Sequence, residues 1–371
     1  MVAKELAAIG IMPAADESGG VSFPADDATL FAANLHLRAA SRVLVRVASF
    51  TAKSFAELER RAKSVPWNAY VRPGGVVDFR VTCKKSRLYH SDAVAERLGK
   101  SLMAQLPSAR TVTSGAADDE ADDSTATGDD TTPQLFVVRF DHDTCTISAD
   151  ASGELLHRRG YRLATAKAPI RETIAAGCLL ALGYDGSAPL IDPMCGSGTF
   201  PIEAALIARS IAPGLARSFA CEQWPQFDRA AAARVRVRAK AAVLATAPAP
   251  IHASDRDAGA VEATLANAAR AGVGASLVVT QCPLSAIQSP GPAGLIVVNP
   301  PYGARVGERT ALRNLYAQFG NVARTKLPGW RAALVLAEQS LEAQIKLPLK
   351  NVTKFSNGGI RVRLVATDAA V

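Results

Sequence analysis

Four consecutive residues, Asn299-Pro300-Pro301-Tyr302, carry the most specific chemical signal in the sequence. They follow an apolar run at 294–298 that predicts a buried strand. Two prolines remove backbone donors and stiffen the turn, so the carbonyls of Asn299 and Pro300 and the Asn299 side-chain oxygen can face one direction. These acceptors suit an amino group, and the Tyr302 ring can stack on the planar base that carries it.

The chemistry that such a turn serves is methyl transfer to an exocyclic amine. This amine is a poor nucleophile because its lone pair is delocalised into the ring. Acceptors can hold it in line with a sulfonium methyl group and stabilise the positive charge that develops on nitrogen. This chemistry requires no metal or strong base, and a plain Pro-Pro turn is the alternative reading.

A glycine-containing loop, Asp192 to Thr199, follows the predicted strand 189–192 and opens a predicted helix. Glycines allow a sharp turn and close approach to a ligand, and the helix start offers free amides. The loop has neither the G-x-G-x-x-G of a dinucleotide site nor the Gly-Lys-Ser/Thr of a phosphate loop. It suits a cofactor that carries a carboxylate, an amine and a ribose; an ordinary turn is the alternative.

Two further strand ends carry polar residues. The strand 251–254 runs into Asp255-Arg256-Asp257, where an acid can bind the ribose hydroxyls. Asp255 is nearer the strand end and is preferred, while Asp257 is either the alternative ribose ligand or the N-cap of the following helix. Gln281 follows the strand 277–279 and can accept a hydrogen bond from an adenine amine.

The order of elements after residue 155 predicts a doubly wound α/β sheet that binds ligands at the carboxyl ends of its strands. Short apolar runs at 189–192, 251–254, 277–279, 294–298 and 332–336 alternate with helices at 198–211 and 258–271. Asn357-Gly358 predicts a closing antiparallel hairpin. The first half reads as an α+β module, with strands at 43–47, 76–81, 135–140 and 144–148 and helices at 54–62 and 90–102. Ser54 is the expected N-cap of the first helix, because Glu57 follows at a capping-box spacing.

The net charge of +8 conceals a split, because residues 114–133 hold seven acids and no Lys or Arg. The remaining chain carries +15, which favours an anionic partner such as nucleic acid. The acidic segment predicts a flexible loop.

Six cysteines without a C-x-x-C spacing argue against structural zinc. The absence of a secretory start or a long apolar run favours a cytoplasmic protein.

With these motifs, the chain resembles the class I methyltransferase fold, and in detail the THUMP-containing RNA guanine-N2 methyltransferases, particularly the bacterial 23S rRNA branch. The resemblance covers nearly the whole chain. Its matching segments are NLHLRAASRVLVRV (34–47), CKKSRLYHSDAVAERL (83–98), GELLHRRGYRLATAKAPIRETIAA (153–176), PLIDPMCGSGTFPIEAALIARSIAPG (189–214), CEQWPQFD (221–228), HASDRDAGAVEATLANAARAGV (252–273) and VVNPPYGARVG (297–307).

This resemblance implies a partial ferredoxin-like piece at 1–45, an RNA-binding THUMP domain at 46–152 and a methyltransferase domain at 153–371. It implies S-adenosylmethionine as cofactor and the N2 of a guanine in 23S rRNA, or else in tRNA, as the methyl acceptor. Carried over by residue, the catalytic turn is Asn299, Pro300, Pro301 and Tyr302, and the cofactor contacts are Thr173, Asp192, Met194, Cys195, Gly196, Gly198, Thr199, Asp255 and Gln281.

Three departures from the family pattern qualify these expectations. Relatives usually place a strand before the match to Lys4-Glu5-Leu6-Ala7, so we expect an incomplete ferredoxin-like piece or a misplaced start codon. Gln281 stands where many methyltransferases have an Asp for the adenine amine. Some relatives continue into a second methyltransferase domain, whereas this sequence stops at Val371, and we expect one reaction from it.

Basic residues predict where RNA would bind, through phosphate contacts that give affinity but little sequence information. The RNA-binding residues that we predict are Lys84, Lys85, Arg158, Arg159 and Arg162; for any one of them a solvated surface role is the alternative. Competing functions are an adenine-N6 DNA methyltransferase, a glutamine-amide methyltransferase acting on protein, and a non-catalytic RNA-binding assembly factor. The THUMP-like first half argues against the first two, and the intact loop and turn argue against the third.

Overall fold

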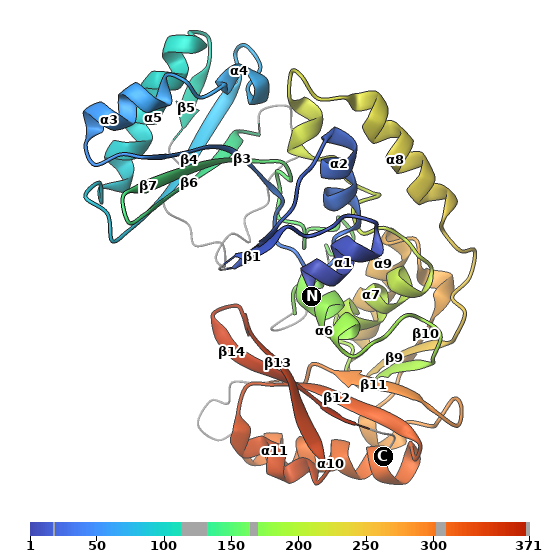
Figure 1. Cartoon of the computed structure of the whole chain (residues 1–371). Coiled ribbons are helices and arrows are strands. Elements are labelled where there is room, and N and C mark those ends of the chain that lie inside the picture. The colour runs from blue at the N-terminus through green and yellow to red at the C-terminus, as the bar shows by residue number, and fades with distance from the viewer. Residues whose placement is uncertain (18, 113–131, 164–169, 302–308, 369–371) are drawn as a thin grey trace.

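A computed structural model describes residues 1–17, 19–112, 132–163, 170–301 and 309–368. Two sheets lie at opposite ends of the molecule, with the N-terminal elements between them (Figure 1). The acidic segment up to residue 131 and Tyr302 lie outside the described residues. No helix in these ranges combines the length and apolar character that a bilayer crossing requires.

The second half forms a seven-stranded sheet with strand order β10-β9-β8-β11-β12-β14-β13. All neighbours are parallel except at β14, which runs antiparallel to both β12 and β13. This confirms the predicted doubly wound sheet with a closing hairpin. The strands are β8 (Leu190–Asp192), β9 (Ile251–Asp255), β10 (Leu277–Gln281), β11 (Gly294–Val298), β12 (Trp330–Leu336), β13 (Leu349–Asn357) and β14 (Ile360–Thr367).

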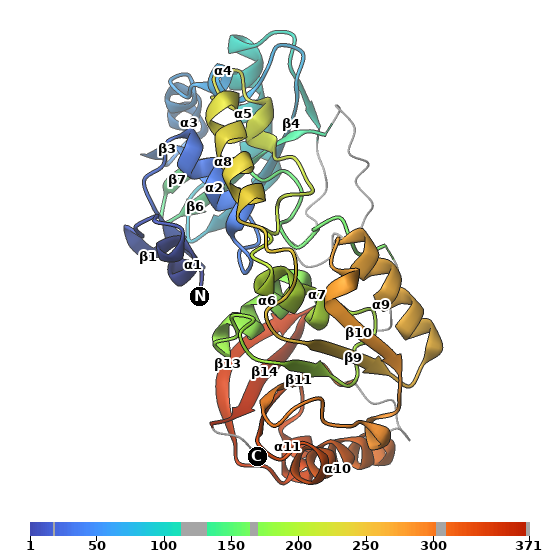
Figure 2. The same cartoon turned by 90° about the vertical axis from the view of Figure 1, so that its right-hand side faces the viewer.

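Helices cover both faces of this sheet because its strands are apolar on both sides. One face packs against α6 (Glu172–Ala181), α7 (Thr199–Ala208) and α9 (Ala258–Arg270), and the other against α10 (Arg309–Lys326) and α11 (Gln339–Ile345) (Figure 2). At the hairpin, Asn357 pairs with Ile360. The two-residue loop is therefore Gly358-Gly359, and both glycines have the positive φ that such a tight turn requires.

The first half contains a five-stranded sheet of order β3-β7-β6-β4-β5. Ser54 caps α3, accepting from the Glu57 amide at 3.3 Å, as the capping-box spacing predicts. Helices α3 and α5 cover one face over Trp67, Phe79 and Phe136. The elements are β3 (Leu44–Thr51), α3 (Phe55–Ala62), α4 (Trp67–Tyr70), β4 (Val76–Lys84), α5 (Ser91–Gln105), β5 (Arg110–Val112), β6 (Gln134–Asp141) and β7 (Thr144–Asp150).

The N-terminal elements are α1 (Val2–Ala8), β1 (Ala15–Glu17), β2 (Gly20–Ser22) and α2 (Asp27–His36). Helix α8 (Arg229–Ala241) comes from the second half of the sequence but packs against α2 (Figure 1). Phe31 meets the edge of Phe219 at 5.6 Å between ring centroids. The hydrophobic core that joins the N-terminal elements and the five-stranded sheet, here called the first hydrophobic core, also includes buried residues between 212 and 239. These lie well beyond the expected domain boundary at residue 153.

Candidate cofactor and amine site

Strand register brings the predicted site residues to one edge of the seven-stranded sheet. Asp192 pairs with Ala253, and Gln281 pairs with Asp255. Ile296 of β11 pairs with Ile191, so Asn299 follows at the same carboxyl edge. This edge also contains the point between β8 and β11 where the strand order reverses, which is where ligands bind in such sheets.

The loop after β8 is folded around two carboxylates. Asp192 Oδ1 accepts from the Met194 amide at 3.1 Å, and Asp255 Oδ2 accepts from the Gly196 amide at 3.0 Å. Gly198 has φ +87°, and a Cβ there would lie 2.8 Å from the Thr264 Cγ2 atom. Gly198 also precedes α7 without a side-chain cap, so the first amides of that helix stay available to a polar group.

Two polar residues of α9 support the loop and were not predicted from the sequence. The buried Thr264 hydroxyl donates to the Gly196 carbonyl at 2.9 Å. The buried Asn267 side-chain amide donates to the Ser197 carbonyl at 2.9 Å. The available signal was their spacing, because residues three apart share a helix face and this face is otherwise apolar.

Asp192 is fully buried, and the pKa of its carboxyl is raised to about 8: burial is the main cause, the hydrogen bond from the Met194 amide opposes it, and the neighbouring Asp255 carboxylate adds to it. A buried acid held in this way is stabilised by a cationic group nearby. Together with the glycine cradle and the free amides of α7, it fits a cofactor that carries an amine and a carboxylate.

The second carboxylate, Asp255, is anchored at both oxygens: besides the Gly196 amide, it accepts from the Asp257 amide at 3.0 Å. Each carboxylate oxygen keeps a lone pair for a ribose hydroxyl. Asp257 is the N-cap of α9 and accepts from the Gly259 amide at 3.0 Å. Gln281 is exposed, and its Nε2 donates to the Arg256 carbonyl at 3.3 Å. Among the described residues, no hydrogen bond uses its Oε1.

The turn after β11 presents an unpaired acceptor. Asn299 Oδ1 is buried and, within the described ranges, has no hydrogen-bond partner. A buried acceptor without a donor costs about 1–3 kcal/mol, which a bound amine would offset. Pro300 is buried and Pro301 is exposed. Because Tyr302 lies outside the described residues, its predicted stacking role stays a prediction.

The other predicted cofactor residues line the interior near the loop. Cys195 is buried, which raises the pKa of its thiol, and its sulfur lies 3.5 Å from the Thr264 hydroxyl. Met194 is half-buried against the core under β11. Thr199 and Thr173 are buried in the first turns of α7 and α6, which pack together.

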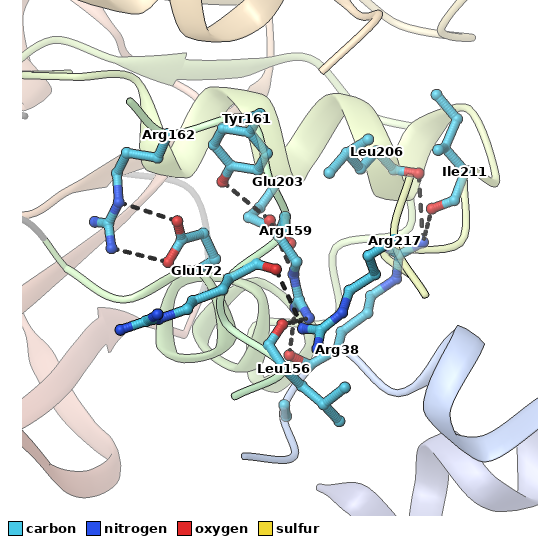
Figure 3. A network of polar contacts seen from close by, with 12 residues as sticks. Arg38, Leu156, Arg159, Tyr161, Arg162, Glu172, Glu203, Leu206, Ile211 and Arg217 are labelled. Atoms are coloured by element: carbon cyan, nitrogen blue, oxygen red, sulfur yellow. Dashed lines mark hydrogen bonds and ion pairs between the residues drawn. The ribbon is translucent and has the colours of Figure 1, made fainter. Parts of the chain in front are cut away.

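The predicted RNA contacts at 158–162 need correction, because most of this basic stretch is internal (Figure 3). Arg159 is buried, lies 3.5 Å from the Glu203 carboxylate and donates to the Arg38 carbonyl at 2.6 Å. Arg162 pairs with the buried Glu172 at 3.0 Å. Arg158 is half-buried and lies 3.7 Å from Glu154. The sequence shows the positive charge but not the distant acids and carbonyls that the arginines bind.

A concave surface lies on the five-stranded sheet, on the face away from α3 and α5. It is a cleft of about 1480 Å³ between that face, the N-terminal elements and residues 224–227. Arg46, Arg80 and Arg139 project from this face, as the strand register requires. Lys84 and Lys85 are exposed at the end of β4, beyond the cleft lining.

Comparisons with known proteins agree with this architecture. The family model described as RMKL-like, methyltransferase domain matches residues 159–366, and the model for the RlmL ferredoxin-like domain matches residues 1–44. The candidate RNA methyltransferases slr0064 of Synechocystis and YpsC of Bacillus subtilis are each 32% identical. These matches cover 98% and 97% of this chain and 92% and 91% of those proteins.

Ribosomal RNA large subunit methyltransferase K/L of Syntrophotalea carbinolica is 34% identical over the whole chain, which spans 52% of that protein. Among solved structures, a protein from Listeria monocytogenes described as a predicted N6-adenine-specific DNA methylase is 31% identical, with a TM-score of 0.82 and coverage of 98% and 92%. A candidate methyltransferase, SMU.472, complexed with SAH is 29% identical, with a TM-score of 0.83 and coverage of 100% and 95%. The chain therefore belongs to the RMKL-like methyltransferase family, and its seven-stranded domain is that of a class I S-adenosylmethionine-dependent methyltransferase.

Proposed function

We propose that this chain is a cytoplasmic enzyme that transfers a methyl group from S-adenosylmethionine to the exocyclic N2 of a guanine in RNA, with 23S rRNA as the preferred substrate. The observation that carries this proposal is the buried Asn299 Oδ1, which has no partner in the part of the chain that the structure describes and lies at the same sheet edge as the cofactor loop. The names of the relatives, RNA methyltransferases in general and large-subunit rRNA methyltransferase K/L in particular, support RNA as the substrate.

The cofactor supplies an electrophilic methyl group on a sulfonium. The chain's own residues would hold it: the α7 amides would receive a carboxylate, Asp192 would stabilise the amine, and Asp255 would accept from the ribose hydroxyls. Gln281 Oε1 would accept from the adenine amine. Met194, Cys195, Thr199 and Thr173 exclude water around the loop.

At the acceptor side, Asn299 Oδ1 and the carbonyls of Asn299 and Pro300 accept hydrogen bonds from the target amine. This holds the nitrogen lone pair toward the methyl group and stabilises the positive charge as the bond forms. Pro301 stiffens the turn. The Tyr302 ring stacks on the base that leaves its helix.

The RNA would lie across residues 46–152, which we propose to be a THUMP domain, with Arg46, Arg80 and Arg139 in the cleft and Lys84 and Lys85 at its end as phosphate contacts. Clustered arginines on a concave surface provide the sequence-independent part of RNA affinity. This arrangement moves the proposed RNA contacts from the buried 158–162 stretch to the open sheet face.

Guanine-N2 methylation of tRNA is the nearest alternative, since it uses the same residues. Adenine-N6 methylation is the second candidate, because the description of the Listeria structure names it and the same acceptor turn suits an adenine amine. Mass spectrometry of nucleosides from rRNA, tRNA and DNA of cells with and without the gene separates these. Loss of N2-methylguanosine from 23S rRNA in cells without the gene supports the proposal. Loss of N2-methylguanosine only from tRNA would favour the tRNA alternative, and loss of N6-methyladenine from DNA would favour adenine methylation.

A further inference from the structure

A chain of hydrogen bonds leads from the cofactor loop to the segment 156–162, here called the linker. The Asn267 amide donates to the Ser197 carbonyl of the loop at 2.9 Å, and its own oxygen accepts from an Arg270 guanidinium nitrogen. The Arg270 Nε donates to the Tyr161 carbonyl of the linker at 2.8 Å. Arg270, at the end of α9, therefore ties the loop to the linker through one intermediate side chain.

The linker is in turn fixed to the N-terminal elements (Figure 3). Arg159 donates to the Arg38 carbonyl at 2.6 Å, and the Arg38 guanidinium donates to the Ile211 carbonyl at 2.7 Å. The Glu5 carboxylate of α1 accepts from the amides of Arg38 and Ala39 at 2.7 and 3.1 Å. The position of the linker is thus tied to the N-terminal half of the molecule.

The loop depends on this outside support. Gly196 and Gly198 give it little stiffness of its own, since both adopt positive φ and lack a Cβ. Its shape is therefore set by the side chains that hold its carbonyls. Asn267 is fully buried, so it cannot turn to water when Arg270 is removed.

We propose that Asn267 and Arg270 are positioning residues that hold the cofactor loop in register with the linker, so that cofactor affinity and RNA binding are coupled through them. The coupling rests on the proposed RNA substrate, whereas the hold on the loop does not. Neither residue touches the reacting atoms in this scheme; each acts through the carbonyls of Ser197 and Tyr161.

The first experiment measures S-adenosylhomocysteine binding by calorimetry and thermal unfolding of each variant. Arg270→Met should weaken binding by roughly tenfold, because the buried Asn267 side-chain oxygen loses the guanidinium that donates to it. Arg270→Lys, which keeps one donor, should recover part of this loss. The matched control is Arg209→Met, because Arg209 also donates to two carbonyls, of Leu244 and Gly272, beside the end of α9 but has no described contact with the loop.

Arg209→Met should lower the melting temperature by a similar amount and change the dissociation constant less than twofold. Equal weakening by both variants, or unchanged binding in Arg270→Met, would overturn the proposal. Asn267→Asp gives a second reading, since it keeps the acceptor for Arg270 but loses the donor to Ser197; it too should weaken binding.

The second experiment adds an unmodified 23S rRNA transcript and compares S-adenosylhomocysteine affinity with and without it. The wild type should bind the cofactor product more tightly in the presence of RNA, and Arg270→Met should lose this gain. A gain that persists in the variant contradicts the coupling. If the wild type does not bind the transcript, the 23S rRNA substrate is wrong, and the first experiment still decides the positioning role.

Discussion

The carboxyl edge of the seven-stranded sheet and the open face of the five-stranded sheet hold their polar groups in opposite ways. At the edge, Asp192 and Asp255 are fixed by backbone amides, and Asn299 keeps one buried acceptor without a partner among the described residues. On the open face, Arg46 and Arg139 are exposed on strands. Polar groups held in fixed positions suit a reaction in which small displacements of the reacting atoms lower the rate. Exposed cations suit phosphate contacts, which add affinity without requiring exact geometry. The arginines of the linker form a third class: Arg159 is buried, Arg158 and Arg162 are half-buried, and each is paired with an acid.

The largest expected effect separates buried from exposed arginines. Arg159→Met should lower the free energy of unfolding by about 3–5 kcal/mol, because it removes the ion-pair partner of the fully buried Glu203 carboxylate. Arg139→Met, on the open face, should change it by less than about 0.5 kcal/mol. Urea unfolding of both variants measures the difference. Similar values for the two would contradict the assignment of Arg159 to the interior.

At the edge, Asn299→Ala should lower kcat by roughly 10²-fold or more, as removal of one preorganised polar group does. Binding of RNA and cofactor should change little, because most contacts lie elsewhere. Single-turnover assays on rRNA fragments test this. Tyr302→Ala should instead weaken base capture by about 1–3 kcal/mol, and Tyr302→Phe should be mild. A wild-type rate in Asn299→Ala would make the tetrapeptide a structural turn only.

Asp255 and Asp257 offer a matched pair of carboxylates two residues apart. Asp255→Ala should weaken cofactor binding by about 1–3 kcal/mol, since it removes both the ribose acceptor and the partner of the Gly196 amide. Asp257→Ala should cost stability through the lost N-cap and leave affinity nearly unchanged. Calorimetry with S-adenosylhomocysteine decides; a larger loss at Asp257 would transfer the ribose role there.

On the open face, replacing Arg46 and Arg139 with Ala should weaken RNA binding and reduce the slope of log affinity against log salt by about 2 in total. Cofactor affinity should stay the same. Lys100→Ala is the control, because Lys100 lies on α5, which covers the opposite face of the sheet. Binding titrations at several salt concentrations measure the slope. An unaltered slope would contradict the proposal that RNA binds in the cleft.

The last expected effect is a pH dependence of stability that arises from Asp192. Its pKa is about 8 in the fold and about 3.9 in the unfolded chain, so the folded state retains a proton between these values. Its contribution to stability is therefore complete below pH 4 and lost as pH rises through 8. Asp192→Asn should flatten the fall in melting temperature between pH 5 and 9. An equal fall in both proteins would show that Asp192 ionises normally.

Local patterns were sufficient to predict the sheet that carries the site. The apolar runs ending in Asp192, Asp255 and Val298 became parallel strands, and their ends define one edge because neighbouring parallel strands share a direction. The Ser54 cap and the closing hairpin followed from spacing alone, although the hairpin loop is Gly358-Gly359, one residue beyond Asn357-Gly358.

Contacts between distant segments could not be predicted in this way. Arg159 and Glu203 lie 44 residues apart, and nothing near either residue identifies the other as its partner. The lone acid Glu203 in an otherwise apolar helix was the available signal. Helix α8 was also not predicted, because its alternating Ala and Arg residues give no clear apolar stripe, and its place beside α2 is decided by the aromatic residues before it.

The sharing of the first hydrophobic core has a consequence for synthesis on the ribosome. Phe31 and Trp67 belong to a core that Phe219, Trp224 and Ala239 complete. A nascent chain that has reached residue 152 therefore exposes part of its apolar interior, and by the time residue 239 is added, β8 and α7 are already made. The two halves must mature together rather than one after the other. Until then, the growing N-terminal half exposes apolar surface that its own later residues cover.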